Sequence, residues 1–350
     1  MTEKHGGDWA GFQTEYGSLP LDFSANVSPL GLPAGVREAA ARALDDADRY
    51  PDPLCRKLRA RIAEKHGVPA AQIVCGNGAA DLIYRICRAV RPRRALLTAP
   101  DFGAYGSALR AENCEIRTVI RPASEDFRLD PDRLREAMDG AELLFLSNPN
   151  NPSGLLTEKA TLRRILERCA EVSCVPVIDE CFMDFSAHPE ENSLIPELRC
   201  WPDLVILKAF TKTYAMAGLR LGYALCGNAS LAERIQNEGQ PWPVSNVAQE
   251  AGAAALKNEN YVNQLRLLIS SERQRMIRAM ETLGLCVLPG AANYLLFRCR
   301  EEDLEKKLRE RGILIRDCSS FEGLSAGWFR IAIRTGEEND RLLGALREVL

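Results

Sequence analysis

Residues 204–223 read LVILKAFTKTYAMAGLRLGY, and the meaning of the whole chain depends on this stretch. It opens with an apolar run as long as a buried strand, which predicts that the polar residues after it lie at a strand end. Lys212 follows that run with the hydroxyl of Thr211 beside it, and Arg220 comes shortly afterwards. On its own such a lysine is typical of a solvated loop, so other parts of the chain must decide its role.

The three side chains together suit one kind of ligand, an aldehyde that carries a phosphate. A lysine amine forms a Schiff base with an aldehyde, while a hydroxyl and a guanidinium can hold a phosphate. If this interpretation is right, other strand ends should supply the remaining contacts of such a cofactor.

Composition is that of an ordinary soluble protein. The chain has 350 residues, of which 46% are hydrophobic and 27% charged. This length predicts about two domains. The 45 basic and 48 acidic residues are mixed, with a formal net charge of −3, so no broad positive field is expected to attract nucleic acid or a membrane. The run Arg91-Pro92-Arg93-Arg94 is interpreted as a solvated turn.

Targeting and metal signals are weak in this sequence. No apolar stretch approaches the roughly 20 residues that a membrane span needs, and the opening MTEKHGGD has no signal-peptide hydrophobic region, so we expect a cytoplasmic protein. The 12 cysteines form no C-x-x-C pair, which favours buried reduced thiols. With 3 histidines available, no metal site is expected.

Short β-type runs alternate with helical patterns from residue 73 to 225, which predicts a parallel sheet with helical crossovers. The expected helices cover residues 34–47, 54–66, 78–90, 104–111, 158–172 and 261–283. The expected strands cover residues 73–74, 95–97, 115–119, 143–146, 175–178, 204–207, 221–225, 293–298, 313–316 and 329–333.

The pattern changes after Gln240-Pro241-Trp242-Pro243, where long helices replace the alternation. We therefore predict an α/β fold with two domains. The large domain, with a mostly parallel central sheet, covers residues 45–240. The smaller α+β domain combines residues 1–44 with residues 241–350.

Gly76-Asn77-Gly78-Ala79-Ala80-Asp81 lies between an expected strand and an expected helix. Free backbone N–H groups and the helix dipole make such a turn a site for a phosphate. A dinucleotide fingerprint would need glycine in place of Asp81, so that interpretation is weak. A glycine-rich helix start without a ligand stays open as the alternative.

Two further strand ends carry polar groups. Residues 147–154, read SNPNNPSG, follow one strand and place Asn151 where it can donate to a phenolate oxygen, although the segment also suits a bare turn. Asp179 ends another strand, where a buried carboxylate needs a cation or donor. A protonated pyridine nitrogen would serve, and a structural salt bridge would serve equally well.

These signals, in this order, resemble the fold-type-I pyridoxal-phosphate-dependent transferases of the aspartate aminotransferase superfamily, the class I/II aminotransferases. The resemblance spans nearly the whole chain. Within that group the sequence is most similar to histidinol-phosphate aminotransferases and to the threonine-phosphate decarboxylases of cobalamin synthesis, which share Tyr50-Pro51-Asp52-Pro53, residues 147–154 and residues 217–223.

The resemblance assigns roles to individual residues around pyridoxal 5'-phosphate. Lys212 forms the Schiff base and Asp179 pairs with the pyridine nitrogen, so both are the expected catalytic residues. The expected cofactor contacts are Ala79, Ala80, Phe102, Asn151, Asp179, Thr211, Lys212 and Arg220, together with Tyr50. Tyr50 would reach the cofactor of a neighbouring subunit, which implies a homodimer.

Three features favour the decarboxylases. The opening His5-Gly6-Gly7 with LDFSANVSPLG at residues 21–31 is similar to their amino terminus, which implies that His5 and Asn26 contact the substrate phosphate. Residues 314–318 and 328–334 are similar to their carboxyl end, so Arg330 would bind the α-carboxylate and Arg316 the phosphate. Phe182 stands where the aminotransferases usually carry tyrosine.

The resemblance also includes a departure, because Ala209 stands where relatives generally carry serine or threonine. One hydroxyl for the cofactor phosphate is then missing, and weaker retention of the cofactor is expected. We expect decarboxylation of a small phosphorylated amino acid, L-threonine O-3-phosphate to 1-aminopropan-2-ol O-phosphate. The alternative is a histidinol-phosphate-type or other class I/II aminotransferase that uses 2-oxoglutarate and glutamate. A non-catalytic regulator on this fold is disfavoured, since Lys212 is present.

Overall fold

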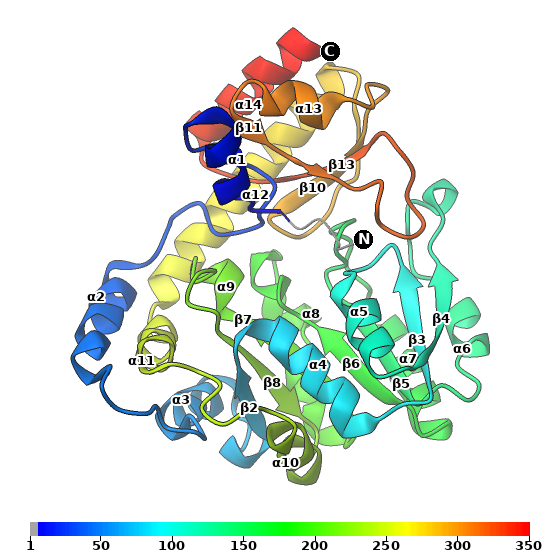
Figure 1. Cartoon of the computed structure of the whole chain (residues 1–350). Helices are drawn as coiled ribbons and strands as arrows, with labels where there is room; N and C mark the ends of the chain where they lie inside the picture. The colour runs from blue at the N-terminus through cyan, green and yellow to red at the C-terminus, as the bar shows by residue number, and fades with distance from the viewer. Residues whose placement is uncertain (1–5) are drawn as a thin grey trace.

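The structure is a computed structural model that describes residues 6–350. Its largest element is a seven-stranded sheet in the order β2-β8-β7-β6-β5-β3-β4 (Figure 1). The strands are β2 (Ile73–Gly76), β3 (Arg94–Ala99), β4 (Glu115–Ile120), β5 (Leu143–Ser147), β6 (Val175–Asp179), β7 (Val205–Ala209) and β8 (Gly222–Cys226). Neighbouring strands are parallel except at β8, which runs antiparallel to both β2 and β7. The predicted α/β fold with a mostly parallel sheet is therefore confirmed.

Helices cover both faces of this sheet, which explains why its strands read as continuous apolar runs. Successive residues of a strand point to opposite faces, so Val177 and Ile178 of β6 belong to two different hydrophobic clusters. One cluster packs against α4 (Gly78–Val90), α5 (Ala104–Ala111) and α10 (Ala229–Asn237), and the other against α3 (Arg56–His66) and α7 (Lys159–Glu171).

A second sheet lies above the first in Figure 1 and is antiparallel throughout, in the order β12-β13-β10-β9. Its strands are β9 (Cys286–Val287), β10 (Tyr294–Arg298), β12 (Arg316–Asp317) and β13 (Trp328–Ala332). The amino-terminal strand β1 (Leu21–Asp22) pairs with β11 (Ile313–Leu314), so the two ends of the chain contribute to one region. Around it lie α1 (Trp9–Tyr16), α13 (Leu304–Arg309) and α14 (Gly336–Val349).

Long helix α12 (Glu259–Thr282) runs from this second region toward α11 (Asn246–Ala255) and α2 (Ala34–Arg42) (Figure 1). Helix α11 packs against α2 and α3. The remaining short elements are α6 (Pro131–Glu136), α8 (Pro189–Asn192), α9 (Phe210–Thr213), η1 (Ala43–Asp46), η2 (Ala70–Gln72), η3 (Ala123–Glu125), η4 (Met183–Phe185) and η5 (Ile195–Cys200). The domain limits at residues 44 and 240 stay a prediction.

Most expected elements are present, with local differences. The expected helix at residues 34–47 changes to a 3-10 turn after Arg42, and the expected strand at residues 313–316 is two short strands interrupted at Ile315. Within residues 6–350, no helix is long and apolar enough to cross a membrane. The same residues contain no cluster of histidine, cysteine and acidic side chains suited to a metal ion.

Candidate active site

A cavity of about 760 Å³ lies between the carboxyl ends of the large-sheet strands and the second region. Eleven of the predicted site residues line it: Asn26, Ala79, Ala80, Phe102, Asn151, Asp179, Thr211, Lys212, Arg220, Arg316 and Arg330. Tyr50 does not line it, since its side chain is 78% exposed and stacks on Trp242 with ring centroids 4.3 Å apart. His5 lies outside the described residues.

Lys212 enters the cavity from α9, a single turn that directly follows β7. Burial, together with the positive charges of Arg330 and Arg220, lowers the pKa of its amine to about 8. With this pKa about a fifth of the amine is neutral at pH 7.4, far more than for an ordinary lysine, and the neutral form is the one that attacks a carbonyl.

A second lysine nearby, Lys208 on β7, is in a different electrostatic state. Its Nζ donates to Oδ1 of Asp184 at 2.7 Å. Burial alone would lower the pKa of Lys208, but the carboxylates of Asp184 and Glu180 outweigh it and raise that pKa, so the amine stays protonated. Thr213 donates to the other oxygen of Asp184 at 2.9 Å, so the ion pair also fixes the turn that carries Lys212.

The start of α4, where the sequence predicts an anion site, is closely packed against Arg220 and β8. Gly78 has φ +82°, and a Cβ built there would lie 2.6 Å from Nη2 of Arg220. On β8, a Cβ at Gly222 would lie 2.6 Å from the backbone nitrogen of Ala79. Both glycines are therefore needed for the N–H groups of α4 and the Arg220 guanidinium to approach one point. Thr211 lines the same cavity and adds a hydroxyl.

Two hydrogen bonds fix the Asp179 side chain at the end of β6. Tyr105 donates to its Oδ2 at 2.6 Å, and the backbone N–H of Cys181 donates to Oδ1 at 2.9 Å. Burial and the Asp179 charge raise the pKa of Tyr105, which keeps its hydroxyl protonated as a donor. Sequence reasoning missed Tyr105; the available signal was its place one helical turn after Phe102.

Arg330 is a buried cation, 7% exposed, without a carboxylate partner among residues 6–350. Its Nη1 donates to Oδ1 of Asn151, its Nη2 donates to the Ser24 carbonyl at 3.3 Å, and its Nε has no hydrogen-bond partner in the described part of the chain. The guanidinium lies over the Tyr294 ring at 5.3 Å, and burial lowers its pKa. A buried guanidinium that meets only neutral groups lacks a counterion, which an anionic ligand would supply.

Arg316 is the direct cross-strand partner of Arg330, because β12 and β13 pair antiparallel with these two residues opposite each other. Arg316 lies over the Phe321 ring at 5.5 Å and donates to Ser320 at 3.4 Å. Two neighbouring cations repel each other unless negative charge lies between or beside them. The pair therefore fits a ligand with two anionic groups.

Four cavity residues, Asn151, Asn26, Phe182 and Ala209, add detail to the expectations from the sequence. Asn151 uses its Oδ1 for Arg330, which leaves its NH₂ group to donate elsewhere. Asn26 is 3% exposed, and none of residues 6–350 forms a hydrogen bond with its Oδ1. The Phe182 ring lies 5.8 Å from the Lys212 amine and offers no hydroxyl, and Ala209 lines the cavity at the end of β7.

These residues fit pyridoxal phosphate. Lys212 provides an amine of lowered pKa for the Schiff base. The start of α4 and Arg220 would hold the phosphate, at a place where the backbone is too close to Gly222 for any side chain at that position. Asp179 would pair with a protonated ring nitrogen. Phe102 borders the same space and could cover one face of the ring.

Comparison with known proteins gives the same picture. The family described as aminotransferase class I and II matches residues 20–346. The threonine-phosphate decarboxylase of Salmonella typhimurium is 39% identical over 352 residues, covering 99% of this chain and 96% of the relative.

Two solved structures are also similar. The histidinol-phosphate aminotransferase from Clostridium acetobutylicum has a TM-score of 0.88 at 29% identity, and the L-threonine-O-3-phosphate decarboxylase from Porphyromonas gingivalis has 0.82 at 26%. Each alignment covers 93% of this chain and 98% of the other.

Proposed function

Because this chain belongs to the aminotransferase class I and II family, we propose that it is a pyridoxal 5'-phosphate-dependent decarboxylase of an O-phosphorylated amino acid. The favoured substrate is L-threonine O-3-phosphate, and the product is 1-aminopropan-2-ol O-phosphate. A place in cobalamin synthesis agrees with this, since a cobalamin-biosynthesis protein of Leptospira interrogans is 30% identical over 99% of this chain.

The observation that carries the proposal is the pair of cross-strand arginines, Arg316 and Arg330. Threonine phosphate presents a carboxylate and a phosphate, one for each guanidinium. Histidinol phosphate has a phosphate but no carboxylate, so it would leave Arg330 buried without a counterion, and only the glutamate of an aminotransferase cycle would supply one.

The residues divide the work by position. Arg330 holds the carboxylate, Arg316 and Asn26 hold the substrate phosphate, and Asp179 faces the ring nitrogen. When bound, the cofactor supplies an electron sink for the pair left when the carbon–carbon bond breaks. Carbon dioxide leaves, and the Lys212 amine delivers the proton that replaces it on Cα.

The orientation in which Arg330 would hold the substrate carboxylate is what would select this outcome over transamination. If Arg330 held the substrate so that the Cα–H took the reactive position in place of the carboxylate, Lys212 would remove that proton. The histidinol-phosphate aminotransferase similarity keeps this second reaction as the candidate to exclude.

One assay decides between the two. Holoenzyme is incubated with O-phospho-L-threonine and no keto acid, and carbon dioxide and the amine product are measured, with Lys212→Ala as control. We expect both products in equal amounts. A strict requirement for 2-oxoglutarate, with formation of glutamate, would contradict the proposal.

We further propose that the enzyme is a homodimer, with Tyr50 reaching the cofactor of the neighbouring subunit. The exposed aromatic pair of Tyr50 and Trp242 supports this, since contiguous exposed apolar surface marks interfaces. Mixing Tyr50→Phe with Lys212→Ala protein tests it: hybrid dimers should regain activity, because one of their two sites is intact. Activity no higher than that of the separate variants would contradict it.

The cytoplasm is the proposed location. All 12 cysteines are free and 10 of them are buried, which suits a reducing compartment. Cell fractionation should place the protein with the soluble fraction, and recovery outside the cytoplasm would contradict this.

A further inference from the structure

The turn at residues 22–26 borders the cavity and is organised by one buried carboxylate. Asp22 is 4% exposed. Its Oδ1 accepts from the backbone N–H of Ser24 at 2.7 Å, from the Ser24 hydroxyl at 2.6 Å and from the Ala25 N–H at 3.3 Å. Its Oδ2 accepts from the Trp9 indole N–H at 2.7 Å. This one side chain therefore fixes the conformation of the turn.

The turn contacts Arg330 directly. The Ser24 carbonyl accepts from Nη2 of Arg330, and the Ser24 hydroxyl accepts from the Gly7 N–H at 2.8 Å. The chain at Gly6 packs so closely that a Cβ there would lie 2.2 Å from the Ser24 carbonyl oxygen. Ser24 is thus held from both sides, and its carbonyl cannot move without displacing residues 6–9.

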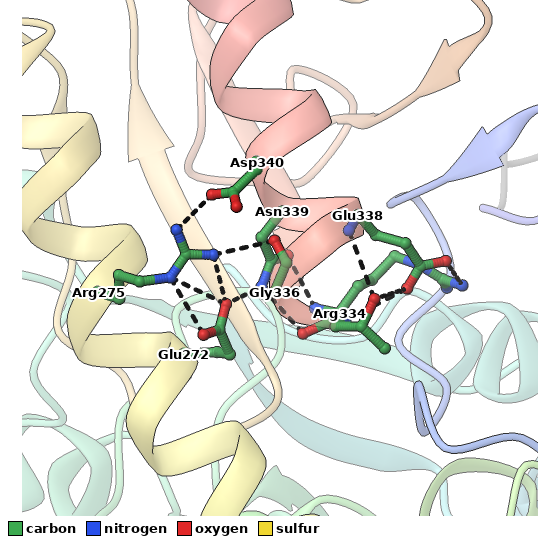
Figure 2. A network of polar contacts seen from close by, with 8 residues as sticks. Glu272, Arg275, Arg334, Gly336, Glu338, Asn339 and Asp340 are labelled. Atoms are coloured by element: carbon green, nitrogen blue, oxygen red, sulfur yellow. Dashed lines mark hydrogen bonds and ion pairs between the residues drawn. The ribbon is translucent and has the colours of Figure 1, made fainter.

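The backbone of Asp22 is anchored from the other direction by Arg334, which donates to its carbonyl at 3.1 Å. Figure 2 shows Arg334 beside Glu338 at the start of α14, and the Nη2–Oε1 distance is 2.7 Å. Asn339 of the same turn donates to the Arg334 carbonyl and to Glu272 of α12. A continuous set of polar contacts therefore runs from α12 to the turn at residues 22–26.

We propose that Asp22 is a positioning residue for substrate recognition: through the Ser24 carbonyl it orients the Arg330 guanidinium toward the substrate carboxylate. This inference rests on the proposed function, in which Arg330 binds that carboxylate. Asn151 and the Tyr294 ring constrain one side of the guanidinium, and the Ser24 carbonyl fixes the other. Without it the guanidinium can rotate, and the Arg330–carboxylate geometry is lost.

The test measures affinity without turnover. Two analogues that lack the amine are titrated into holoenzyme by calorimetry: 3-phosphooxybutanoate, which has a carboxylate and a phosphate, and propyl phosphate, which has only the phosphate. The variant is Asp22→Asn, which keeps the shape but replaces one of the two acceptor oxygens by an NH₂ donor, so that the contacts with Trp9 and with the turn cannot both be kept. The matched control is Asp8→Asn, the same change at the cap of α1, where Asp8 accepts from the Gly11 N–H and forms no hydrogen bond with residues 22–26.

We expect Asp22→Asn to weaken the binding of 3-phosphooxybutanoate about tenfold and that of propyl phosphate about twofold or less. Asp8→Asn should bind both analogues with affinities close to those of the wild type. In an Arg330→Gln background, Asp22→Asn should have almost no further effect, because its contribution acts through Arg330. Cofactor affinity should be unchanged. If Asp22→Asn does not fold, Ser24→Ala removes the two contacts of the Ser24 hydroxyl, with Asp22 and with the Gly7 N–H, and should change the ratio of the two analogue affinities about threefold.

The outcomes separate the two claims. A wild-type enzyme that does not prefer the carboxylated analogue would overturn the carboxylate role of Arg330, and this inference with it. A wild-type preference that persists in Asp22→Asn, or equal losses for both analogues, would overturn the role of Asp22 and leave the proposed function standing.

Discussion

Substituting Gly222 by alanine should damage the cofactor site while leaving the fold intact. Gly222 opens β8 and faces the first turn of α4, where the added Cβ would lie 2.6 Å from the Ala79 nitrogen. Ordinary contact begins at 3.4 Å, so the backbone must separate by 3.4 − 2.6 = 0.8 Å. Neither atom belongs to a flexible side chain, and the N–H groups of α4 must therefore move.

Overpacking of this kind costs about 1–3 kcal/mol, which corresponds to about 5- to 150-fold in an equilibrium constant. If the strain appears mainly when the phosphate cradle is assembled, it reduces the affinity for pyridoxal phosphate by that factor. If the strain is present in both the apoenzyme and the holoenzyme, it lowers the free energy of unfolding of the apoenzyme instead of the cofactor affinity.

The assay is a titration of apoenzyme with pyridoxal phosphate, followed by absorbance, alongside urea unfolding of the apoenzyme. Gly218→Ala is the matched control, because a Cβ there meets no atom within 4 Å. We expect a weaker cofactor affinity for Gly222→Ala and no change for Gly218→Ala. Wild-type affinity and stability in Gly222→Ala would refute the argument that this glycine shapes the phosphate site.

Three other substitutions or conditions test the site. Arg330→Lys should lower kcat/KM for threonine phosphate at least about 30-fold, since breaking a buried charge pair costs about 2 kcal/mol or more. A loss of less than about threefold in steady-state assays would contradict the role of Arg330 in binding the carboxylate. In the apoenzyme, the rate at which an amine-directed reagent labels Lys212, followed by mass spectrometry, should be half-maximal near pH 8. Only the neutral amine reacts, and burial lowers the pKa of this amine to about 8. A midpoint near pH 10.5 would show that Lys212 behaves as an ordinary lysine. Ala209→Ser should increase the affinity for pyridoxal phosphate about tenfold, because it adds one hydroxyl that can bind the cofactor phosphate. An equilibrium titration that shows no gain in affinity would count against the position of residue 209 beside that phosphate.

Local sequence signals were sufficient for much of the fold. The helices at Gly78–Val90 and Ala104–Ala111 have the predicted bounds, since each follows a strand and a glycine-containing turn. The antiparallel direction of β8 could not be predicted from the sequence, because an apolar run such as residues 221–225 is equally compatible with parallel and antiparallel pairing. Helix α14 was missed, although its capping box, with Thr335 and Glu338, is visible in the sequence.

The convergence of the predicted site residues on one cavity was predictable, because parallel strands bring their carboxyl ends together. Contacts that depend on register or on distant pairs were not. Tyr105 meets Asp179 across 74 residues, and Arg316 faces Arg330 only through the pairing of β12 with β13. Asp22 carries no local motif of its own, and its importance follows only from the donors that the fold gathers around it.

The central claim is that a single lysine, Lys212, holds the cofactor. Holoenzyme reduced with borohydride, digested and mapped by mass spectrometry tests it directly, with Lys208 as a nearby internal control that is committed to an ion pair with Asp184. We predict one pyridoxyl adduct, on the peptide that contains Lys212 and at that residue. An adduct on Lys208 or another lysine, or none after saturation with pyridoxal phosphate, would contradict the account.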